Sequence, residues 1–143
     1  MSYKASAKMK PILVVLNLNS DDALTSGDPI DWVVQDGSSG HGVTTSNGVV
    51  TLTSGFKWFA QCQVVLTTVT ACSFDWYVDG GVSSTFAPTG VEIVTAGGAT
   101  SNIVAHLYVD ASTSTTDLEL RSNNAVTAEA SHCFLILVGY PTS

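Results

Sequence analysis

Apolar and polar residues alternate along most of the chain with a period of two, which is the spacing of a strand that packs on one side only. The clearest run covers residues 56–66, where one face carries Phe56, Trp58, Ala60, Cys62, Val64 and Leu66. A second run covers residues 70–78, where one face carries Thr70, Cys72, Phe74, Trp76 and Val78. The two runs are joined through Thr67 and Thr68, and we predict that they form the strongest pair of strands in the sequence.

The same alternation predicts further strands and no helix between them. In residues 43–52, Asn47-Gly48 supplies the two positive-φ residues of a tight hairpin turn between β-branched flanks. Other strands are expected at residues 12–18, 30–34, 102–110, 115–122 and 132–140, separated by segments rich in Gly, Ser and Thr. Eight or nine strands in 143 residues predict one all-β domain, built as an antiparallel sandwich or a barrel.

The last predicted strand raises the question whether His132 and Cys133 form a catalytic pair. Neighbouring residues on a strand point to opposite faces, so these two cannot exchange a proton on one side of it. Both faces of this strand are apolar, with Phe134, Ile136, Val138 and Tyr140 on one and Cys133, Leu135 and Leu137 on the other. We predict a strand buried on both sides, either centrally in a sandwich or between the sheet and a partner subunit.

Composition and charge narrow the classes of partner. The chain has 18 Val and 17 Thr against ten Lys, Glu and Gln together, a balance that favours strands. Twelve acidic groups face five basic ones, and three of the basic residues, Lys4, Lys8 and Lys10, precede Pro11. The acidic remainder is expected to repel nucleic acid and anionic membranes. No stretch approaches the roughly 20 apolar residues of a membrane span.

Three cysteines are an odd number, which favours a reducing compartment during folding over a closed disulfide framework. Cys62 and Cys72 have no second ligand pair at the spacing of a zinc site, so we expect paired core thiols, with a disulfide between them left open. Asp75 and Asp79 are about 13 Å apart along a strand. That exceeds the roughly 5–9.5 Å between the carboxylates of a glycosidase. We therefore expect no enzyme and no cofactor.

Two further groups of side chains have an ordinary and a functional interpretation. The acidic residues between 21 and 31 are expected to form a solvated loop, with a calcium site as the alternative; they are Asp21, Asp22, Asp28 and Asp31. Trp58 and Trp76 lie on the apolar stripes and are expected in the core, with a sugar-binding platform as the alternative. His41 and His106 have no partner that the sequence identifies.

Three segments resemble the jelly roll of the tumour-necrosis-factor and complement type. VVTLTSGFKWFAQCQVVL (49–66) is similar to its hairpin strand, in which a turn glycine precedes an aromatic residue that starts an alternating strand. IVAHLYVDASTSTTDLELRS (103–122) is similar to a later strand, loop and strand, and SHCFLILVGY (131–140) to the closing strand. The resemblance implies a jelly-roll sandwich at residues 21–143, a homotrimer, and residues 1–20 as an N-terminal arm or first strand.

Small trimeric jelly rolls of this kind decorate bacteriophage capsids or cap their fibres, so the resemblance implies a virion protein. The expected function is a capsid decoration or cement protein, bound to the major capsid protein through an arm that includes Lys4, Lys8, Lys10, Ile12 and Val14. The expected trimer interface contains Phe59, Val65, Phe134, Ile136, Val138 and Tyr140. The alternative is a fibre tip that binds a host glycan with the loops at 80–90 or 111–116.

Overall fold

Two antiparallel sheets pack face to face in the computed structural model, which describes residues 10–35, 42–67, 72–82, 92–95 and 101–142. Strands follow one another with short connections, and the one helical segment of the described residues is a single 3₁₀ turn, Ala130–His132. A membrane-spanning helix is not found in this part of the chain. The all-β antiparallel sandwich predicted from the alternation is confirmed.

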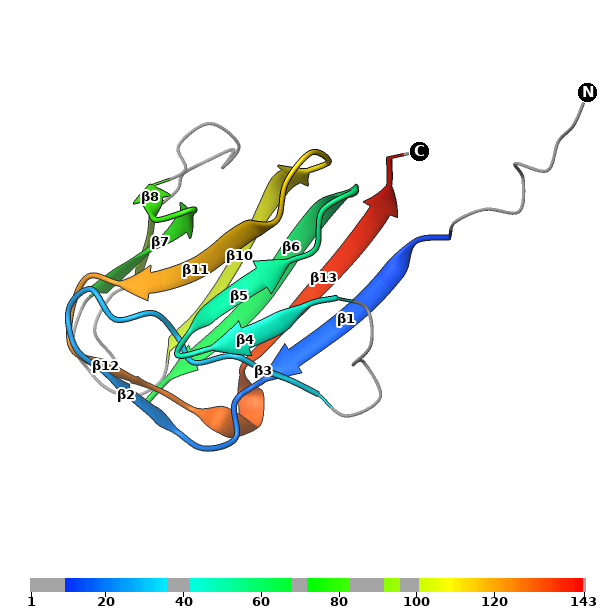
Figure 1. Cartoon of the computed structure of the whole chain (residues 1–143). Helices are drawn as coiled ribbons and strands as arrows, with labels where there is room; N and C mark the ends of the chain where they lie inside the picture. The colour runs from blue at the N-terminus through cyan, green and yellow to red at the C-terminus, as the bar shows by residue number, and fades with distance from the viewer. Residues whose placement is uncertain (1–9, 36–41, 68–71, 83–91, 96–100, 143) are drawn as a thin grey trace, which may run out of the picture.

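Sheet A contains the longest strands. Its order is β3 (Val33–Val34), β1 (Ile12–Asn17), β13 (Phe134–Pro141), β6 (Phe56–Leu66) and β10 (Ser101–Ala111). Two short strands, β12 (Val126–Ala128) and β2 (Asp22–Leu24), extend the sheet beside the end of β6. Figure 1 shows β1, β13, β6 and β10 side by side in one layer, and each neighbouring pair is antiparallel.

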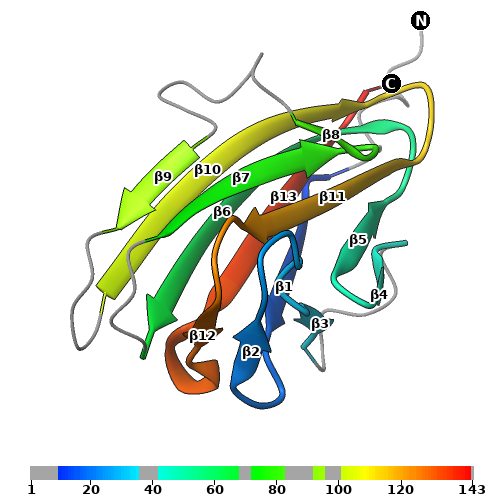
Figure 2. The same ribbon diagram turned by 90° about the vertical axis from the view of Figure 1, so that its left-hand side faces the viewer.

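Sheet B forms the second layer. Its order is β4 (Thr44–Ser46), β5 (Val49–Leu52), β11 (Thr116–Ser122) and β7 (Cys72–Val78). The short strands β8 (Gly81–Val82) and β9 (Glu92–Thr95) pair with opposite ends of β7. Figure 2, turned by 90°, shows β7 and β11 of this layer against β6 and β13 of sheet A.

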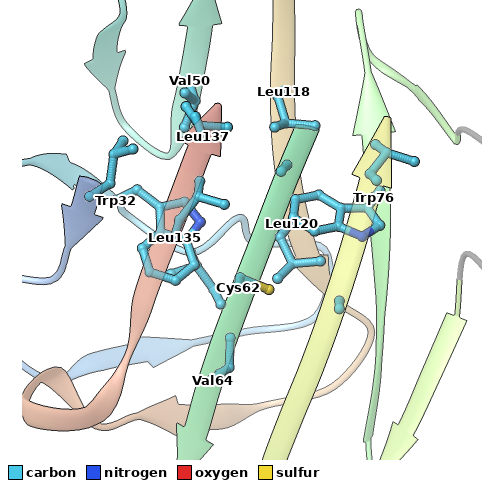
Figure 3. Close-up of a cluster of buried hydrophobic side chains, with 14 of the residues drawn as sticks. Trp32, Val50, Cys62, Val64, Trp76, Leu118, Leu120, Leu135 and Leu137 are labelled. Atoms are coloured by element: carbon cyan, nitrogen blue, oxygen red, sulfur yellow. The ribbon is translucent and has the colours of Figure 1, made fainter. Parts of the chain in front are cut away.

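Apolar side chains from alternate positions of both sheets fill the space between the layers. Figure 3 shows part of this core, with Cys62, Val64, Leu135 and Leu137 from sheet A and Val50, Trp76, Leu118 and Leu120 from sheet B. The largest fully buried side chains include Trp32, Trp58 and Trp76. The core prediction for Trp58 and Trp76 is therefore confirmed, and no tryptophan is left to form a sugar platform.

Most of the predicted strands are present. β6 has the predicted bounds, and Asn47 and Gly48 have φ values of 50° and 85° between β4 and β5, as the predicted turn requires. β13 lies centrally in sheet A, between β1 and β6. The described residues form thirteen strands instead of eight or nine, because five pieces of two or three residues add to eight longer ones.

The predicted pairing of residues 56–66 with residues 70–78 is wrong. β6 pairs within sheet A and β7 pairs within sheet B, so the apolar faces of these two strands meet across the core. Alternation shows which face of a strand is buried. It does not show which strand is the hydrogen-bonded neighbour. Two strands that are each apolar on one face bury those faces equally well when they lie in opposite layers of a sandwich.

Candidate functional site

One face of sheet A packs on the core, and its outer face points away from sheet B. On β13 the inner residues Leu135 and Leu137 are fully buried, as expected from the alternation of strand side chains. The outer residues of the same strand are also apolar or aromatic: Phe134, Ile136, Val138 and Tyr140. The central strand of the sheet therefore presents an apolar surface on the side that no layer of the described residues covers.

Cross-strand register extends this surface into a line across four strands. Leu13 of β1 lies opposite Val138 of β13, Val138 lies opposite Phe59 of β6, and Phe59 lies opposite Tyr108 of β10. We call these four residues the apolar row. The ring centroid of Phe59 is 5.1 Å from that of Tyr108 and 5.8 Å from that of Tyr140, which it meets edge-on. Aromatic rings at these distances attract one another and hold a fixed arrangement.

Exposure distinguishes this face from the rest of the described surface. Five large hydrophobic side chains are exposed, and four of them lie on the outer face of sheet A: Leu13 (56%), Phe59 (50%), Val104 (58%) and Tyr140 (46%). The fifth, Val82 at 53%, is on sheet B. Single exposed hydrophobic residues are common on protein surfaces, whereas a contiguous group marks an interaction site.

The exposed apolar area of this face lies in the range of the largest patch on a typical monomer, about 300–600 Å², and such a patch is often functional. An aromatic side chain buries about 150–250 Å², so the half-exposed rings of Phe59 and Tyr140 each leave roughly 100 Å² open. With Leu13 and Val104, the four residues expose on the order of 400 Å² of apolar surface. A stable interface buries about 800 Å² per partner, with an apolar centre and a polar rim. The exposed residues are sufficient for such a centre.

Polar and apolar residues are mixed beside the apolar row, on the side toward β12. The next line across the sheet contains Ile136, Gln61 and His106, and the line after it contains Phe134, Gln63 and Val104. At the other end Lys57 lies opposite Asp110, and Lys57 contributes to lowering the pKa of Asp110, behind the hydrogen bonds from Ser112. The apolar row is therefore flanked by charged residues at one end and by a mixed polar and apolar surface at the other.

Five of the six residues predicted for the trimer interface lie on this outer face: Phe59, Phe134, Ile136, Val138 and Tyr140. Val65 follows the same alternation but is only 6% exposed, so it adds little to the surface. The sequence interpretation did not include Leu13, Val104 and Tyr108. The alternation of residues 12–18 and 102–110 could have identified them, because it places these three side chains on the face of the strand that points away from the buried positions.

The residues of the proposed arm have different positions. Lys4 and Lys8 lie outside the described residues, and Lys10 is exposed just before β1. Ile12 is half-buried against the core, and Val14 is fully buried in it. Val14 is therefore a core residue of β1 and is not available as a surface contact, because residues 12–17 form the first strand of sheet A.

His132 and Cys133 are directed to different surroundings. His132 ends the 3₁₀ turn, and its Nδ1 lies 2.9 Å from Ser131 Oγ and 3.3 Å from Glu129 Oε1. A serine–histidine–acid triad needs the hydroxyl and the carboxylate on different ring nitrogens, so this arrangement cannot relay a proton. Cys133 is buried, and its Sγ accepts a hydrogen bond of 3.3 Å from the N–H of Val65.

The other buried thiol with a described side chain is Cys62, which is fully enclosed in the core. Burial in an apolar environment disfavours the thiolate and raises the pKa of Cys62 to about 12. A thiol with such a pKa is inert as a nucleophile at neutral pH. Cys62 is a free thiol, so the disulfide to Cys72 that the sequence left open is not formed. The side chain of Cys72 lies outside the described residues, so a contact between the two thiols stays a prediction.

The aspartates of the acidic loop hold backbone segments together. Asp22 Oδ2 accepts a hydrogen bond from the N–H of Asp31 at 2.8 Å, and Asp31 Oδ1 accepts one from Gly48 at 3.1 Å. Asp21 Oδ1 accepts one from Ala130 at 2.9 Å. Burial raises the pKa of Asp22. Among the described residues there is no group of three His, Cys, Asp or Glu side chains placed to hold a metal ion.

Comparison with solved structures identifies the architecture. The Eiger tumour necrosis factor of S. frugiperda aligns with a TM-score of 0.64 at 13% identity, over 94% of this chain and 96% of that one. Murine APRIL aligns with the same TM-score and identity, over 92% of this chain and 100% of that one. The chain has the jelly-roll fold of the tumour-necrosis-factor and complement type. This confirms the resemblance seen in the sequence.

The complement side of this jelly-roll type is represented by the globular domain of zebrafish complement 1qA, with a TM-score of 0.53 at 9% identity. That alignment covers 94% of this chain and 98% of the zebrafish domain. No family model and no curated protein sequence matches the chain. Identities this low establish the jelly roll and leave the function to be argued from the surfaces of this chain.

Proposed function

We propose that the protein is a non-enzymatic virion structural protein, a homotrimeric capsid decoration protein that stabilises the shell. The observation that carries the proposal is the exposed apolar outer face of sheet A, centred on Phe59. A group of exposed apolar residues of this kind is a contact surface by the usual criterion, and a second copy of the chain offers the same apolar face to it. A cyclic trimer closes on itself and leaves no unpaired copy of the face.

Charge supports attachment through the N-terminal arm. Lys4, Lys8 and Lys10 precede a remainder with twelve acidic groups and only two basic ones. A basic segment binds an acidic surface on another protein by charge complementarity. Three arms on one trimer bridge neighbouring shell subunits, and linked weak contacts hold far more strongly than a single one. The arm contacts exclude Val14, which is buried.

The trimer is tested by native mass spectrometry at micromolar concentration. Phe59→Ser removes roughly 100 Å² of apolar contact per protomer, or about 2.5 kcal/mol. Three copies give roughly 7 kcal/mol, which weakens the trimer by about 10⁵-fold. The monomer should stay folded, because Phe59 is half-exposed in it.

Val82→Ser is the matched control, since Val82 is equally exposed but lies on sheet B. The control should remain a trimer. A wild-type protein that is monomeric at micromolar concentration contradicts the proposal, and so does a Phe59→Ser trimer as stable as the Val82→Ser trimer.

Decoration is tested separately, with virus particles that lack this protein. Deletion of residues 2–10 should leave a trimer that no longer adds to the particles. Changing Lys4, Lys8 and Lys10 to Glu should weaken addition in a salt-dependent way, because the contacts are electrostatic. A truncated trimer that decorates particles as well as the full chain would refute the role of the arm.

A further inference from the structure

A polar pocket lies on the outer face of sheet B, on the side of the sandwich opposite to the apolar face. It has a volume of about 160 Å³ and is lined by residues 26–27, by Asp75 and Tyr77 of β7, and by residues 121–123. We call it the Arg121 pocket. Its volume equals that of roughly five water molecules, which is room for one sugar ring. A trimer built through sheet A leaves this pocket open to solvent.

Arg121 is the single arginine of the chain and is held in a fixed position. Its guanidinium carbon lies 3.9 Å from the centroid of the Tyr77 ring, and its Nη2 donates a 2.7 Å hydrogen bond to Glu119 Oε1. The Glu119 side chain is only 10% exposed, so this ion pair is partly shielded from water. Asp75 lies directly opposite Arg121 in the register of β7 and β11.

The rim of the pocket is also fixed before any ligand arrives. The N–H of Gly27 donates a 2.7 Å hydrogen bond to the carbonyl of Ser122, and Ser26 Oγ donates one of 3.1 Å to the carbonyl of Asn123. The N–H of Ser122 in turn donates to the carbonyl of Asp28 at 3.1 Å. These bonds join two segments that are far apart in the sequence, and a wall that is ordered in advance lowers the entropy lost on binding.

One donor of Arg121 lacks a partner. Arg121 Nε is buried and has no hydrogen-bond acceptor within the described part of the chain. A buried donor without an acceptor costs stability, and such groups are rare enough in folded proteins to need an explanation. Because Nε is buried, a ligand oxygen reaches this N–H only if the side chain turns toward the pocket and its contact with Tyr77 adjusts. The guanidinium thus retains hydrogen-bonding capacity in spite of its ion pair with Glu119.

The charges around the pocket determine which class of ligand fits. Glu119 already balances the charge of Arg121, and Asp75 adds a second carboxylate, so an anion such as phosphate finds no net positive charge. A cation is attracted by the two carboxylates, but it would have to displace the guanidinium of Arg121, which already pairs with Glu119 and lies opposite Asp75. A neutral ligand with several hydroxyl groups avoids both penalties, because each hydroxyl donates to a carboxylate or carbonyl and accepts from a guanidinium or amide.

We propose that the Arg121 pocket binds a neutral polyhydroxylated ligand, namely a single sugar residue of a surface glycan. The pocket takes the exocyclic hydroxyls of the sugar between Asp75 and the guanidinium of Arg121, with Ser26 and Asn123 at the rim. This locates the proposed glycan contact on sheet B. The alternative from the sequence, the loops at 80–90 or 111–116, stays a prediction, and residues 83–90 lie outside the described residues. It does not depend on the trimer, since every protomer contains a complete pocket.

The test uses the full chain and the resonance of Arg121. A single arginine gives one Nε–H signal in a nitrogen–proton correlation spectrum, so this signal is assigned without variants. The neutral probes are glucose, galactose, mannose and N-acetylglucosamine at up to tens of millimolar. Sodium phosphate and tetramethylammonium chloride are the anionic and cationic probes. We expect a saturable shift of the Nε–H signal with at least one sugar and with neither salt.

Variants separate binding in the pocket from unspecific effects. Asp75→Asn and Arg121→Lys should each weaken sugar binding by about tenfold or more, as expected for the loss of one charge-assisted hydrogen bond. Asp117→Asn is the matched control, because Asp117 lies on the same face of β11 outside the pocket, and it should leave affinity unchanged. Sugar binding in the Arg121→Lys variant is followed by ligand-detected NMR.

Three results would overturn the proposal. The first is an Nε–H signal that no sugar shifts, and the second is a saturating shift with phosphate or tetramethylammonium. The third is equal sugar affinity in the Asp75→Asn and Asp117→Asn variants. Dispersed spectra of both variants show that they are folded, so that a loss of binding reports on the pocket.

Discussion

Gly139→Ala should destabilise the protein through one contact in the core. Gly139 lies opposite Trp58 in the register of β13 and β6, and it is buried on the inner face of sheet A. A Cβ atom at this position would lie 2.6 Å from Trp58 Cζ3 and 2.8 Å from Cε3 and Cη2. Ordinary contacts begin at 3.4 Å, so the indole or the strand must move by most of an ångström.

Trp58 has little freedom to make this movement. The indole is fully buried, and its Nε1–H donates a 3.2 Å hydrogen bond to the carbonyl of Thr53. Overpacking of a closed core costs about 1–3 kcal/mol. In a chain of this size each kcal/mol lowers the Tm by roughly 3–4 °C, so the expected loss is roughly 3–12 °C.

The matched control is Gly81→Ala. A Cβ atom at Gly81 meets only the carbonyl of Val78 at 3.8 Å, and this exposed position should tolerate alanine with an unchanged or slightly higher Tm. The assay is thermal unfolding followed by circular dichroism at one protein concentration, because the stability of an oligomer depends on concentration.

A double variant tests the assigned cause. In Trp58→Phe the smaller ring makes space for the new methyl group, so Gly139→Ala should cost less in that background than in the wild type. The coupling should be at least about 0.5 kcal/mol. A Gly139→Ala protein as stable as Gly81→Ala, or equal costs in both backgrounds, would show that the indole is not the obstacle.

Three further predictions concern thiols and one turn. Cys62 and Cys133 should resist iodoacetamide at pH 8 until the protein is unfolded, because burial raises both pKa values; peptide mass spectrometry measures this. Cys133→Ala should lower stability by about 1–3 kcal/mol and leave assembly intact, as judged by denaturant unfolding and native mass spectrometry. Thr25→Val should raise the pKa of Asp28 part of the way toward its ordinary value in an NMR titration, because the backbone N–H of Thr25 still lowers it and only the side-chain hydrogen bond is lost. In the wild type Asp28 contributes stability that is lost as pH falls through its lowered pKa.

The sequence predicted which face of each strand is buried better than it predicted which strands pair. Alternation identified the inner residues of β6, β10 and β13, since a period of two depends only on the side of the strand that is wet. It assigned β6 and β7 as partners, and the structure places them in different sheets. Pairing between strands is set by long-range packing, which a local sequence pattern does not reveal.

The candidate sites show the same division. Five residues of the outer face were predicted. Four come from the strand at residues 132–140, which is apolar on both faces, and the fifth is Phe59, an aromatic residue on an otherwise polar face. The Arg121 pocket was not predicted, because its walls come from segments near residues 26, 75 and 121. These segments meet only once the sheet has formed, and each alone reads as an ordinary half-exposed strand or turn.

The proposed trimer contact on sheet A and the proposed sugar pocket on sheet B together predict multivalent binding to a glycosylated surface. A trimer assembled through Phe59 carries three Arg121 pockets, and linked sites that engage together raise overall affinity by about 10²–10⁴-fold over one site. Phe59→Ser should therefore keep the affinity of each pocket for a soluble monosaccharide, because the pocket lies on the other sheet. The same variant should lose retention on a densely glycosylated surface, measured by surface plasmon resonance at equal pocket concentration. Equal retention of wild type and Phe59→Ser would show that the pockets do not act together, even if each binds sugar and the wild type is a trimer.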